Sequence, residues 1–271
     1  MSKSSTPDKP SVPAEAYTKE YYQSCCQGYA EFESSKGELL PLRLSFPLKL
    51  ANIKAGMKVV DIGCGRGEIV IHCARLGAKT WGMDYASEAL NLAREIMNNE
   101  NNLLYKELMA IQKSKSTHLP FANESVDQVF MLDVVEHLNH DELKTTLDEV
   151  WRILRPKGHL VIHTMPNLDY YRFGYPLYRF IQRFRHDRLP ADPRIRWDYS
   201  HVHVNEQTPR KLTLELKRSK FHAKVWLYPI QSYQYEPNRI VRIGMYFLAH
   251  LYPFRWIFCN DIFAIGTKRC A

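Results

Sequence analysis

Three alternating glycines behind a carboxylate form the segment of the chain best suited to chemistry. Residues 59–68 read Val-Val-Asp-Ile-Gly-Cys-Gly-Arg-Gly-Glu, which places Asp61 two residues before Gly63, with Gly65 and Gly67 following. Glycine lacks a Cβ and accepts positive φ, so the backbone can pass very close to a ligand. The spacing is G-x-G-x-G rather than the G-x-G-x-x-G of dinucleotide sites. A carboxylate here would repel a pyrophosphate but suits a ligand that carries an ammonium and a sulfonium.

A second carboxylate lies 23 residues further along the chain, at Asp84. It follows the next expected strand, where doubly wound nucleotide sites place an acid that accepts hydrogen bonds from ribose hydroxyls. Its alternative role is an N-terminal helix cap, which aspartate also favours. The glycine loop and the two acids together point to S-adenosylmethionine as the ligand. Cys64, inside the loop, and Tyr85, next to Asp84, belong to the same predicted cofactor site.

The composition is that of an ordinary globular protein, with 271 residues of which 45% are hydrophobic and 24% charged. It excludes collagen-like, disulfide-knot and wholly disordered chains. The six cysteines never fall in a C-x-x-C pair, so neither a zinc site nor a disulfide framework is predicted, and a reducing cytosol fits best. The polar first residues lack the apolar run of a secretory signal. The apolar stretch at 243–254 is too short to span a membrane. A cytoplasmic location is therefore expected.

Strand-like and helical segments alternate from residue 57 onward and must position these side chains. Strands are expected at 57–62, 79–83, 126–132, 159–163, 223–227 and 259–266, and helices at about 68–76, 87–98, 143–154 and 208–220. The residues at 156–158 are expected to form a turn. Strands separated by helices of about a dozen residues imply parallel βαβ units in an open sheet covered on both faces. The fold class is therefore α/β, doubly wound.

Four segments in this order resemble the successive motifs of the class I S-adenosylmethionine-dependent methyltransferases, particularly the branch that includes the quinone-biosynthesis methyltransferases. They are VVDIGCGRGE, WGMDYASEAL, LPFANESVDQVFMLDVVEHL and LDEVWRILRPKGHLVI. The resemblance covers about residues 56–166 and returns weakly at 203–227. It implies a Rossmann-like, mostly parallel seven-stranded sheet with helices on both faces, interrupted by aromatic-basic insertions. It also implies S-adenosyl-L-methionine as the methyl donor and S-adenosyl-L-homocysteine as the product.

The same resemblance assigns roles to individual residues. The loop around Asp61, Gly63, Gly65 and Gly67 would surround the methionine portion of the cofactor, and Asp84 would bind the ribose. Asp133, at the end of the strand at 126–132, would lie near the methyl donor.

One departure from the family concerns the adenine. Many relatives carry Gly-Asp-Ala before the Leu-Pro-Phe element, whereas the matching positions here are Ser114, Lys115 and Ser116. A lysine only donates hydrogen bonds, so it cannot replace an aspartate that accepts from the adenine amino group. Ser116 is therefore predicted to read the adenine.

Methyl transfer from a sulfonium is an in-line displacement, in which the protein mainly supplies orientation and excludes water. A hydroxyl acceptor gains from a general base, and imidazole suits that task. His137 lies where relatives approach the acceptor, although it would also serve to cap or pack a helix start. His201 and His203 are secondary candidates with structural alternatives.

Four tyrosines mark an expected helix that precedes the core. In similar enzymes such a segment closes over the cofactor, so Tyr21 joins His137 as a candidate catalytic residue. The alternative for each tyrosine is an aromatic face that packs on the core. The four residues are Tyr17, Tyr21, Tyr22 and Tyr29.

The chain divides into four expected parts: a disordered tail at 1–16, a helical lid at 17–55, the cofactor-binding core at 56–168, and a C-terminal part of the same sheet at 169–271 with acceptor-side insertions at 170–197 and 239–256. The formal charge is +1 over 1–57, −3 over 58–168 and +10 over 169–271. The basic, aromatic insertions fit a small anionic or apolar acceptor, an anionic membrane surface or nucleic acid. A solvated basic face without a partner fits equally.

We therefore expect methyl transfer to a small-molecule, secondary-metabolite or lipid-linked acceptor, with peripheral contact between the basic C-terminal third and an anionic membrane. An RNA methyltransferase is the alternative, although the sequence has neither an Asn-Pro-Pro-Tyr element nor a Pro-Cys pair. A catalytically silent cofactor-binding scaffold is a third class. No metal is expected, and the sequence leaves a homo-oligomer open.

Overall fold

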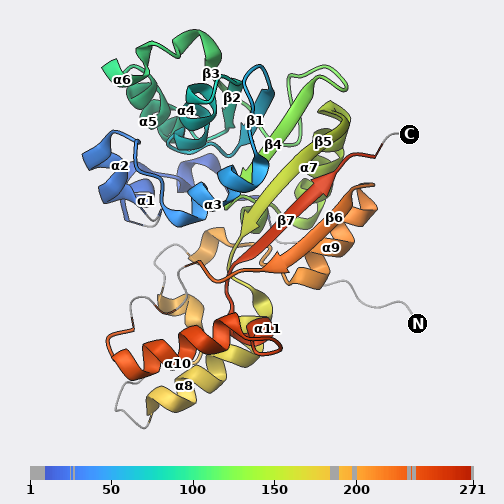
Figure 1. The fold of residues 1–271 in the computed structure, drawn as a ribbon. Helices are drawn as coiled ribbons and strands as arrows, with labels where there is room; N and C mark the ends of the chain where they lie inside the picture. The colour runs from blue at the N-terminus through green and yellow to red at the C-terminus, as the bar shows by residue number, and fades with distance from the viewer. Residues whose placement is uncertain are drawn as a thin grey trace.

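A seven-stranded sheet with helices on both faces organises the computed structural model of the chain (Figure 1). The structure describes residues 10–24, 26, 28–183, 189–196, 200–230, 233 and 236–269. The strands are β1 (Lys58–Ile62), β2 (Lys79–Asp84), β3 (Met109–Lys113), β4 (Val126–Leu132), β5 (Leu154–Thr164), β6 (His222–Leu227) and β7 (Ile262–Thr267), in the order β3-β2-β1-β4-β5-β7-β6. The first five strands pair in parallel, and β7 runs antiparallel to both β5 and β6. The mostly parallel α/β fold is confirmed.

Alternation along the central strands gives the sheet two apolar faces. The residues of one face, among them Val60 and Val129, pack with α7 (His140–Ile153) and α9 (Pro209–Arg218). Their neighbours on the other face, among them Val59 and Phe130, pack with α3 (Leu42–Ala51) and α4 (Glu68–Arg75). Next to α4 lie α5 (Ser87–Met97) and the short α6 (Glu100–Leu103). Because β1, β2 and β4 run parallel, their carboxyl ends lie at the same edge of the sheet, and the loops that follow them converge there.

Three local expectations need correction. The strand β3 (MAIQK) was missed because it is short, ends in two polar residues and buries only Met109, so it shows no clear strand-like alternation. The expected turn at 156–158 lies inside β5, where Lys157 has a φ of 67° and the pairing with β4 is irregular. The expected single N-terminal helix is two helices, α1 (Lys19–Ser24) and α2 (Tyr29–Ser35), separated around Gly28, whose φ of 82° ends a helical path.

The expected disordered tail is also partly wrong. Residues 1–9 lie outside the described residues, but Ala14–Ala16 form a 3₁₀ turn. The Tyr85 hydroxyl donates a hydrogen bond to the Val12 carbonyl at 3.2 Å, and the Tyr17 ring packs edge-on against Tyr85. Aromatic contacts with the core therefore order residues 10–16.

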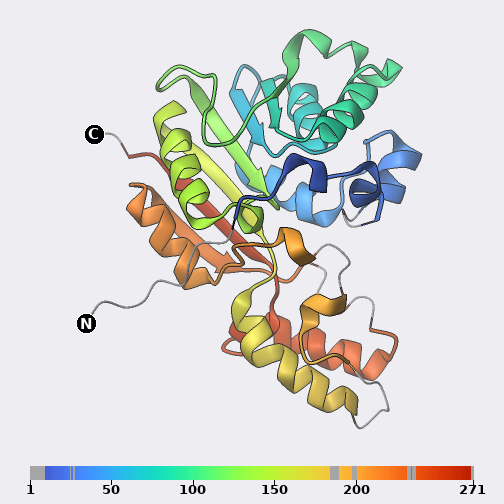
Figure 2. The ribbon, with the colours of Figure 1, turned by 180° about the vertical axis from the view of Figure 1, so that it is seen from behind.

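A separate lobe, which we call the aromatic lobe, extends from the sheet in both views (Figures 1 and 2). It consists of a π-helical turn (Tyr170–Gly174), α8 (Tyr175–Arg183), α10 (Arg239–His250) and α11 (Arg255–Phe258). Its small core contains Tyr175, Tyr178, Met245, Ala249 and Phe258. The two expected insertions thus come together in space, although residues 184–188 and 197 of the first lie outside the described residues. No helix in the described ranges is long and apolar enough to cross a membrane.

Candidate functional site

A cavity of about 700 Å³ lies at the carboxyl ends of the parallel strands. Its wall combines the glycine loop after β1, the ends of β2 and β4, the N-terminal helices and the aromatic lobe. Of the predicted site residues, ten line it: Tyr21, Asp61, Gly63, Cys64, Gly65, Asp84, Tyr85, Ser116, Asp133 and His137. Side chains from five separate stretches of sequence therefore meet around one space.

The glycine loop follows the tight course that the sequence predicts. Gly63 has a φ of 68°, and a Cβ built on it would lie 2.5 Å from Cγ2 of Val134. Gly67 does not line the cavity, so its cofactor contact stays a prediction. It precedes α4 with a φ of 82°, and an added Cβ would lie 3.0 Å from that of Ala93 in α5. Gly67 therefore serves the turn and the helix packing, while Gly63 keeps the cavity wall free of a side chain.

Backbone hydrogen bonds tie this loop to the end of β2. The amides of Gly63 and Cys64 donate to the Met83 carbonyl at 2.7 and 3.1 Å. The Gly65 amide donates to Oδ2 of Asp84 at 3.0 Å, and the Ala86 amide donates to Oδ1 at 2.9 Å. The residue that caps α5 is Ala86, so Asp84 is not the helix cap of the alternative reading. Asp84 instead joins the two loops across the cavity wall.

Two buried carboxyl groups, which can ionise, belong to the cavity wall. Asp61 and Asp84 are 4% and 7% exposed. Burial, followed by the charges of Asp84 and Glu68, raises the pKa of Asp61 well above its usual value. Burial also raises the pKa of Asp84, although backbone amides that donate to it limit the rise. Because desolvation penalises both carboxylates, a cationic ligand would favour their ionised forms.

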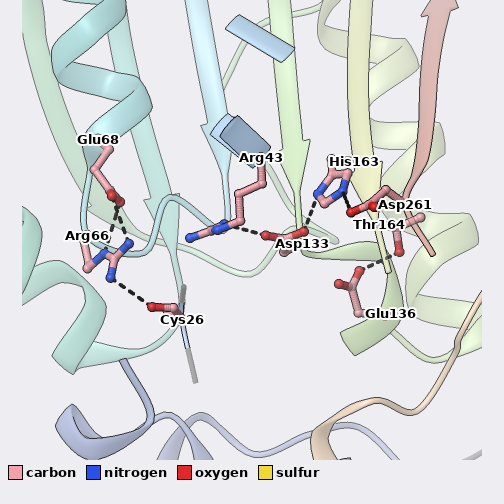
Figure 3. A network of polar contacts seen from close by, with 9 residues as sticks. All are labelled: Cys26, Arg43, Arg66, Glu68, Asp133, Glu136, His163, Thr164 and Asp261. Atoms are coloured by element: carbon pink, nitrogen blue, oxygen red, sulfur yellow. Dashed lines mark hydrogen bonds and ion pairs between the residues drawn. The ribbon is translucent and has the colours of Figure 1, made fainter. Parts of the chain in front are cut away.

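Arg66 contributes differently from its neighbours in the loop. Its guanidinium pairs with Glu68 at 2.9 Å and donates to the Cys26 carbonyl at 3.3 Å (Figure 3). It also lies over the Phe32 ring, 4.8 Å from the ring centre. The loop side chain thus holds the N-terminal segment against α4.

An ion network surrounds Asp133, beside the cavity (Figure 3). Its carboxylate accepts from Arg43 at 2.5 Å and from Nδ1 of His163 at 2.5 Å, and Nε2 of His163 lies 3.3 Å from Asp261. Burial alone would lower the pKa of His163, but the charges of Asp133 and Asp261 raise it to about 10. Burial alone would raise the pKa of Asp133, but His163 and Arg43 lower it. Asp133 is therefore an ionised member of a neutralised network rather than a free carboxylate.

Two adjacent residues after β4 offer proton-accepting groups to the cavity. Nδ1 of His137 lies 3.1 Å from the Val202 carbonyl, which can only accept, so the ring proton sits on Nδ1 and the lone pair on Nε2. Burial and the nearby His203 lower the pKa of His137 to about 3. Burial and the charge of Asp133 raise the pKa of Glu136 to about 8, and the Thr164 hydroxyl donates to it at 2.7 Å. Glu136 thus titrates closer to neutral pH than His137 does.

A third side chain completes this group. Donor atoms of Glu136, His137 and His203 lie within 4.8 Å of one another. Imidazole and carboxylate are ligand types that a divalent transition metal accepts. His203 also lines the cavity, whereas His201 does not.

The remaining predicted residues have structural partners of their own. The hydroxyls of Ser116 and Thr146 lie 2.8 Å apart. The Tyr21 ring packs edge-on against Tyr17 and Tyr22, with ring centres 5.1 and 5.3 Å away. The rings of Tyr17, Tyr21 and Tyr22 therefore pack with one another and also line the cavity, whereas Tyr29 does not line it. The cofactor and catalytic roles of Ser116 and Tyr21 stay predictions.

Sequence reasoning missed Arg43, Glu136 and Asp261, which line the cavity, and His163, which is buried behind Asp133 in the same ion network. Arg43 lies 90 positions from Asp133 in a helix with no motif, and His163 reads as an ordinary strand residue. Glu136 stands next to His137 in the quoted Val-Val-Glu-His motif, which offered a signal that was not used.

Comparisons with known proteins agree with this geometry. Residues 60–162 match the family model of a methyltransferase domain. The chain is 30% identical over 139 residues to the ubiquinone biosynthesis O-methyltransferase of Vibrio cholerae, covering 51% of this chain and 54% of that protein. It is 30% identical over 113 residues to methyltransferase GfsG of Streptomyces halstedii, covering 41% and 38%. The chain thus spans about half the length of the first of these curated relatives, and less of the second.

A solved structure shows the same fold. Phosphoethanolamine N-methyltransferase 2 of Haemonchus contortus, in complex with S-adenosyl-L-methionine, superposes with a TM-score of 0.59 at 16% identity, covering 93% of this chain and 60% of that one. These matches favour neither the RNA methyltransferase nor the silent scaffold. Over residues 60–162 the chain is thus similar to methyltransferase domains, and over about half of its length it is similar to a ubiquinone biosynthesis O-methyltransferase.

Proposed function

We propose that the protein transfers a methyl group from S-adenosylmethionine to a hydroxyl of a small-molecule or lipid-linked acceptor. The observation that carries the proposal is the pair of buried acids, Asp61 and Asp84, beside a loop that leaves no room for a Cβ at Gly63. A cavity wall of this kind fits a cationic ligand that approaches the backbone closely. The family match and the name of the Vibrio cholerae relative support the methyl donor and an oxygen acceptor.

The cofactor fits the residues present. Asp61 would hold the ammonium of its amino-acid end, for which the glycine loop leaves room, and Asp84 and Tyr85 would hold its ribose. When bound, this cofactor supplies a methyl group on an electrophilic sulfonium. The protein's own contribution is to orient the partners and exclude water, which accounts for much of catalysis in an already activated displacement.

Glu136 would accept the proton of the acceptor hydroxyl, and His137 would orient the acceptor. A carboxylate with a pKa of about 8 matches the removal of a hydroxyl proton near neutral pH better than an imidazole with a pKa of about 3. We therefore assign the proton to Glu136 and the orientation of the acceptor to Nε2 of His137. This revises the sequence-based choice of His137 as the base.

The aromatic lobe would form the acceptor side. Tyr170, Tyr171, Tyr175 and Phe258 of the lobe contribute to the cavity wall, as does Tyr233, which packs against the core of the lobe. Arg194 in the same wall is paired with Glu206 at 2.5 Å, so the guanidinium is largely neutralised. A wall of aromatic rings, in which Arg194 is already paired, favours an aromatic or isoprenoid acceptor over a highly charged one.

The test is a product assay with the purified protein. Release of S-adenosylhomocysteine is measured with phenolic, isoprenoid and glycan acceptors, and methylated product is identified by mass spectrometry. We expect turnover with a hydroxylated apolar acceptor. Equilibrium dialysis that detects binding of neither S-adenosylmethionine nor S-adenosylhomocysteine would refute the proposal.

A further inference from the structure

One side of α10 is apolar and faces solvent. Ile240, Ile243, Phe247 and Leu251 recur every three or four residues, so they share one side of the helix, and each is at least 45% exposed. The opposite side, with Met245 and Ala249, is fully buried in the core of the lobe. A helix that already buries one apolar side has no structural need for a second.

Exposed aromatic residues also follow the helix along the chain. Tyr252 is 80% exposed, and Phe254 and Trp256 are each 46% exposed. We call these seven residues the docking face: Ile240, Ile243, Phe247, Leu251, Tyr252, Phe254 and Trp256. Aromatic rings at the end of an apolar stripe are typical of segments that lie at a membrane–water interface.

The helical segments of the aromatic lobe contain arginines but no acidic residue. The π-helical turn, α8, α10 and α11 contain six arginines and no aspartate or glutamate in their sequences. On α10, Arg239 and Arg242 are exposed. Glu236, just before α10, is 5% exposed and bonded to Tyr178 and Gln182 inside the lobe. Within these four helical segments, which the structure describes in full, the acidic and basic residues are therefore all basic.

We propose that the docking face binds the surface of an anionic lipid bilayer, with α10 lying in the plane of the interface. The argument is complementarity: the apolar stripe would enter the acyl boundary while the arginines meet anionic headgroups. A protein partner of ordinary composition would supply charges of both signs, which the lobe does not match. At 12 residues, α10 is too short to cross a bilayer, so it lies on the surface.

Docking would also bring a lipid-linked acceptor close to the cavity. This link between docking and methyl transfer rests on the proposed function. Tyr175 and Phe258 belong to the core of the lobe and line the main cavity. A lobe seated on lipid would therefore hold the acceptor side of the cavity close to the bilayer, where a lipid-linked acceptor resides.

The experiment measures flotation of the full chain with vesicles, without cofactor, so that the result is independent of methyl transfer. Vesicles of phosphatidylcholine alone are compared with vesicles that also contain phosphatidylglycerol, at low and high salt. We expect binding to the anionic vesicles that weakens with salt. Phe247→Glu should reduce the partition coefficient at least about tenfold, and Arg239→Gln about fivefold.

Matched controls lie outside the lobe. Leu104→Glu changes a residue that is 84% exposed beyond α6, and Lys79→Gln changes an exposed cation at the start of β2. Both should bind like the wild type, and all four variants should melt at the wild-type temperature because the altered side chains are exposed. Absence of wild-type binding, or wild-type binding by Phe247→Glu, would overturn the proposal. So would a dimer in light scattering that Phe247→Glu dissociates, or salt-dependent RNA binding without vesicle binding.

Discussion

At the scale of single residues, burial decides what each ionisable group of the cavity can do. Four ionisable residues near the same edge of the sheet show this. Burial and neighbouring charges raise the pKa of Asp61, Glu136 and His163 but lower that of His137. The identity of a residue therefore says less about its role than its surroundings do.

Asp61 gives the most direct test of the cofactor site. Asp61→Asn keeps the shape of the side chain but removes the charge that a cationic ligand would meet. We expect the affinity for S-adenosylmethionine to fall by about thirtyfold or more, measured by calorimetry. Asp127→Asn, in β4 and outside the cavity wall, is the control and should bind normally. Equal affinities for the wild type and Asp61→Asn would show that Asp61 does not contact the ligand.

The proton assignment predicts a pH profile. If Glu136 accepts the proton, the single-turnover rate should rise with pH through an apparent pKa of about 8, because the carboxylate is the active form. Glu136→Gln should lower the rate at least about a hundredfold and remove this rise, with cofactor affinity nearly unchanged. His137→Asn should lower the rate and leave the inflection in place. A profile that keeps its inflection in Glu136→Gln would assign the proton to another group.

The network around Asp133 predicts how stability depends on pH. The pKa of His163 is raised from 6.5 to about 10, so its contribution is complete below about 6.5 and is lost as the pH rises towards 10. The pKa of Asp133 is lowered, so its contribution is lost as the pH falls below the ordinary aspartate range. His163→Gln should cost about 3 kcal/mol at pH 6 and flatten the alkaline decline in denaturant titrations. An equally steep alkaline decline in the variant would contradict this account.

At the scale of elements, the turn from β1 into α4 shapes the cavity. In Gly63→Ala the new Cβ would meet Val134, so we expect the loop to shift and cofactor affinity to fall at least about tenfold. Gly56→Ala is the control, since its φ is 81° but nothing lies within 4 Å of the added Cβ. It should lose stability by about 1 kcal/mol without loss of affinity. Val134→Ala should partly restore the affinity of Gly63→Ala, and a strictly additive double variant would exclude the contact as the cause.

At the scale of the whole molecule, the N-terminal helices and the aromatic lobe enclose a cavity whose floor is the sheet edge. Tyr17, Tyr21 and Tyr22 come from the first of these parts. Because a bound ligand would contact this wall, S-adenosylhomocysteine should slow tryptic cleavage after Lys19 several-fold, with cleavage after Lys106 as the internal control. Equal cleavage rates at Lys19 with and without ligand would show that the segment does not close on it.

The sequence by itself determined the local features of this protein. Alternation in Val-Val-Asp-Ile, the glycine spacing and the amphipathic helices depend on neighbours within a few residues. The mostly parallel sheet and the glycine loop follow from them, and ten of the eleven predicted site residues line the cavity. These patterns say nothing about distance across the chain.

Only the tertiary structure decided the rest. Arg43, Asp133 and His163 share one network although up to 120 positions separate them, and that network converts Asp133 from a free carboxylate into half of an ion pair. The two insertions meet as one lobe, which buries one side of α10 and leaves the other open. Contacts between distant segments set the ionisation of the buried side chains and the exposure of each helix side, and these contacts form only when the chain folds.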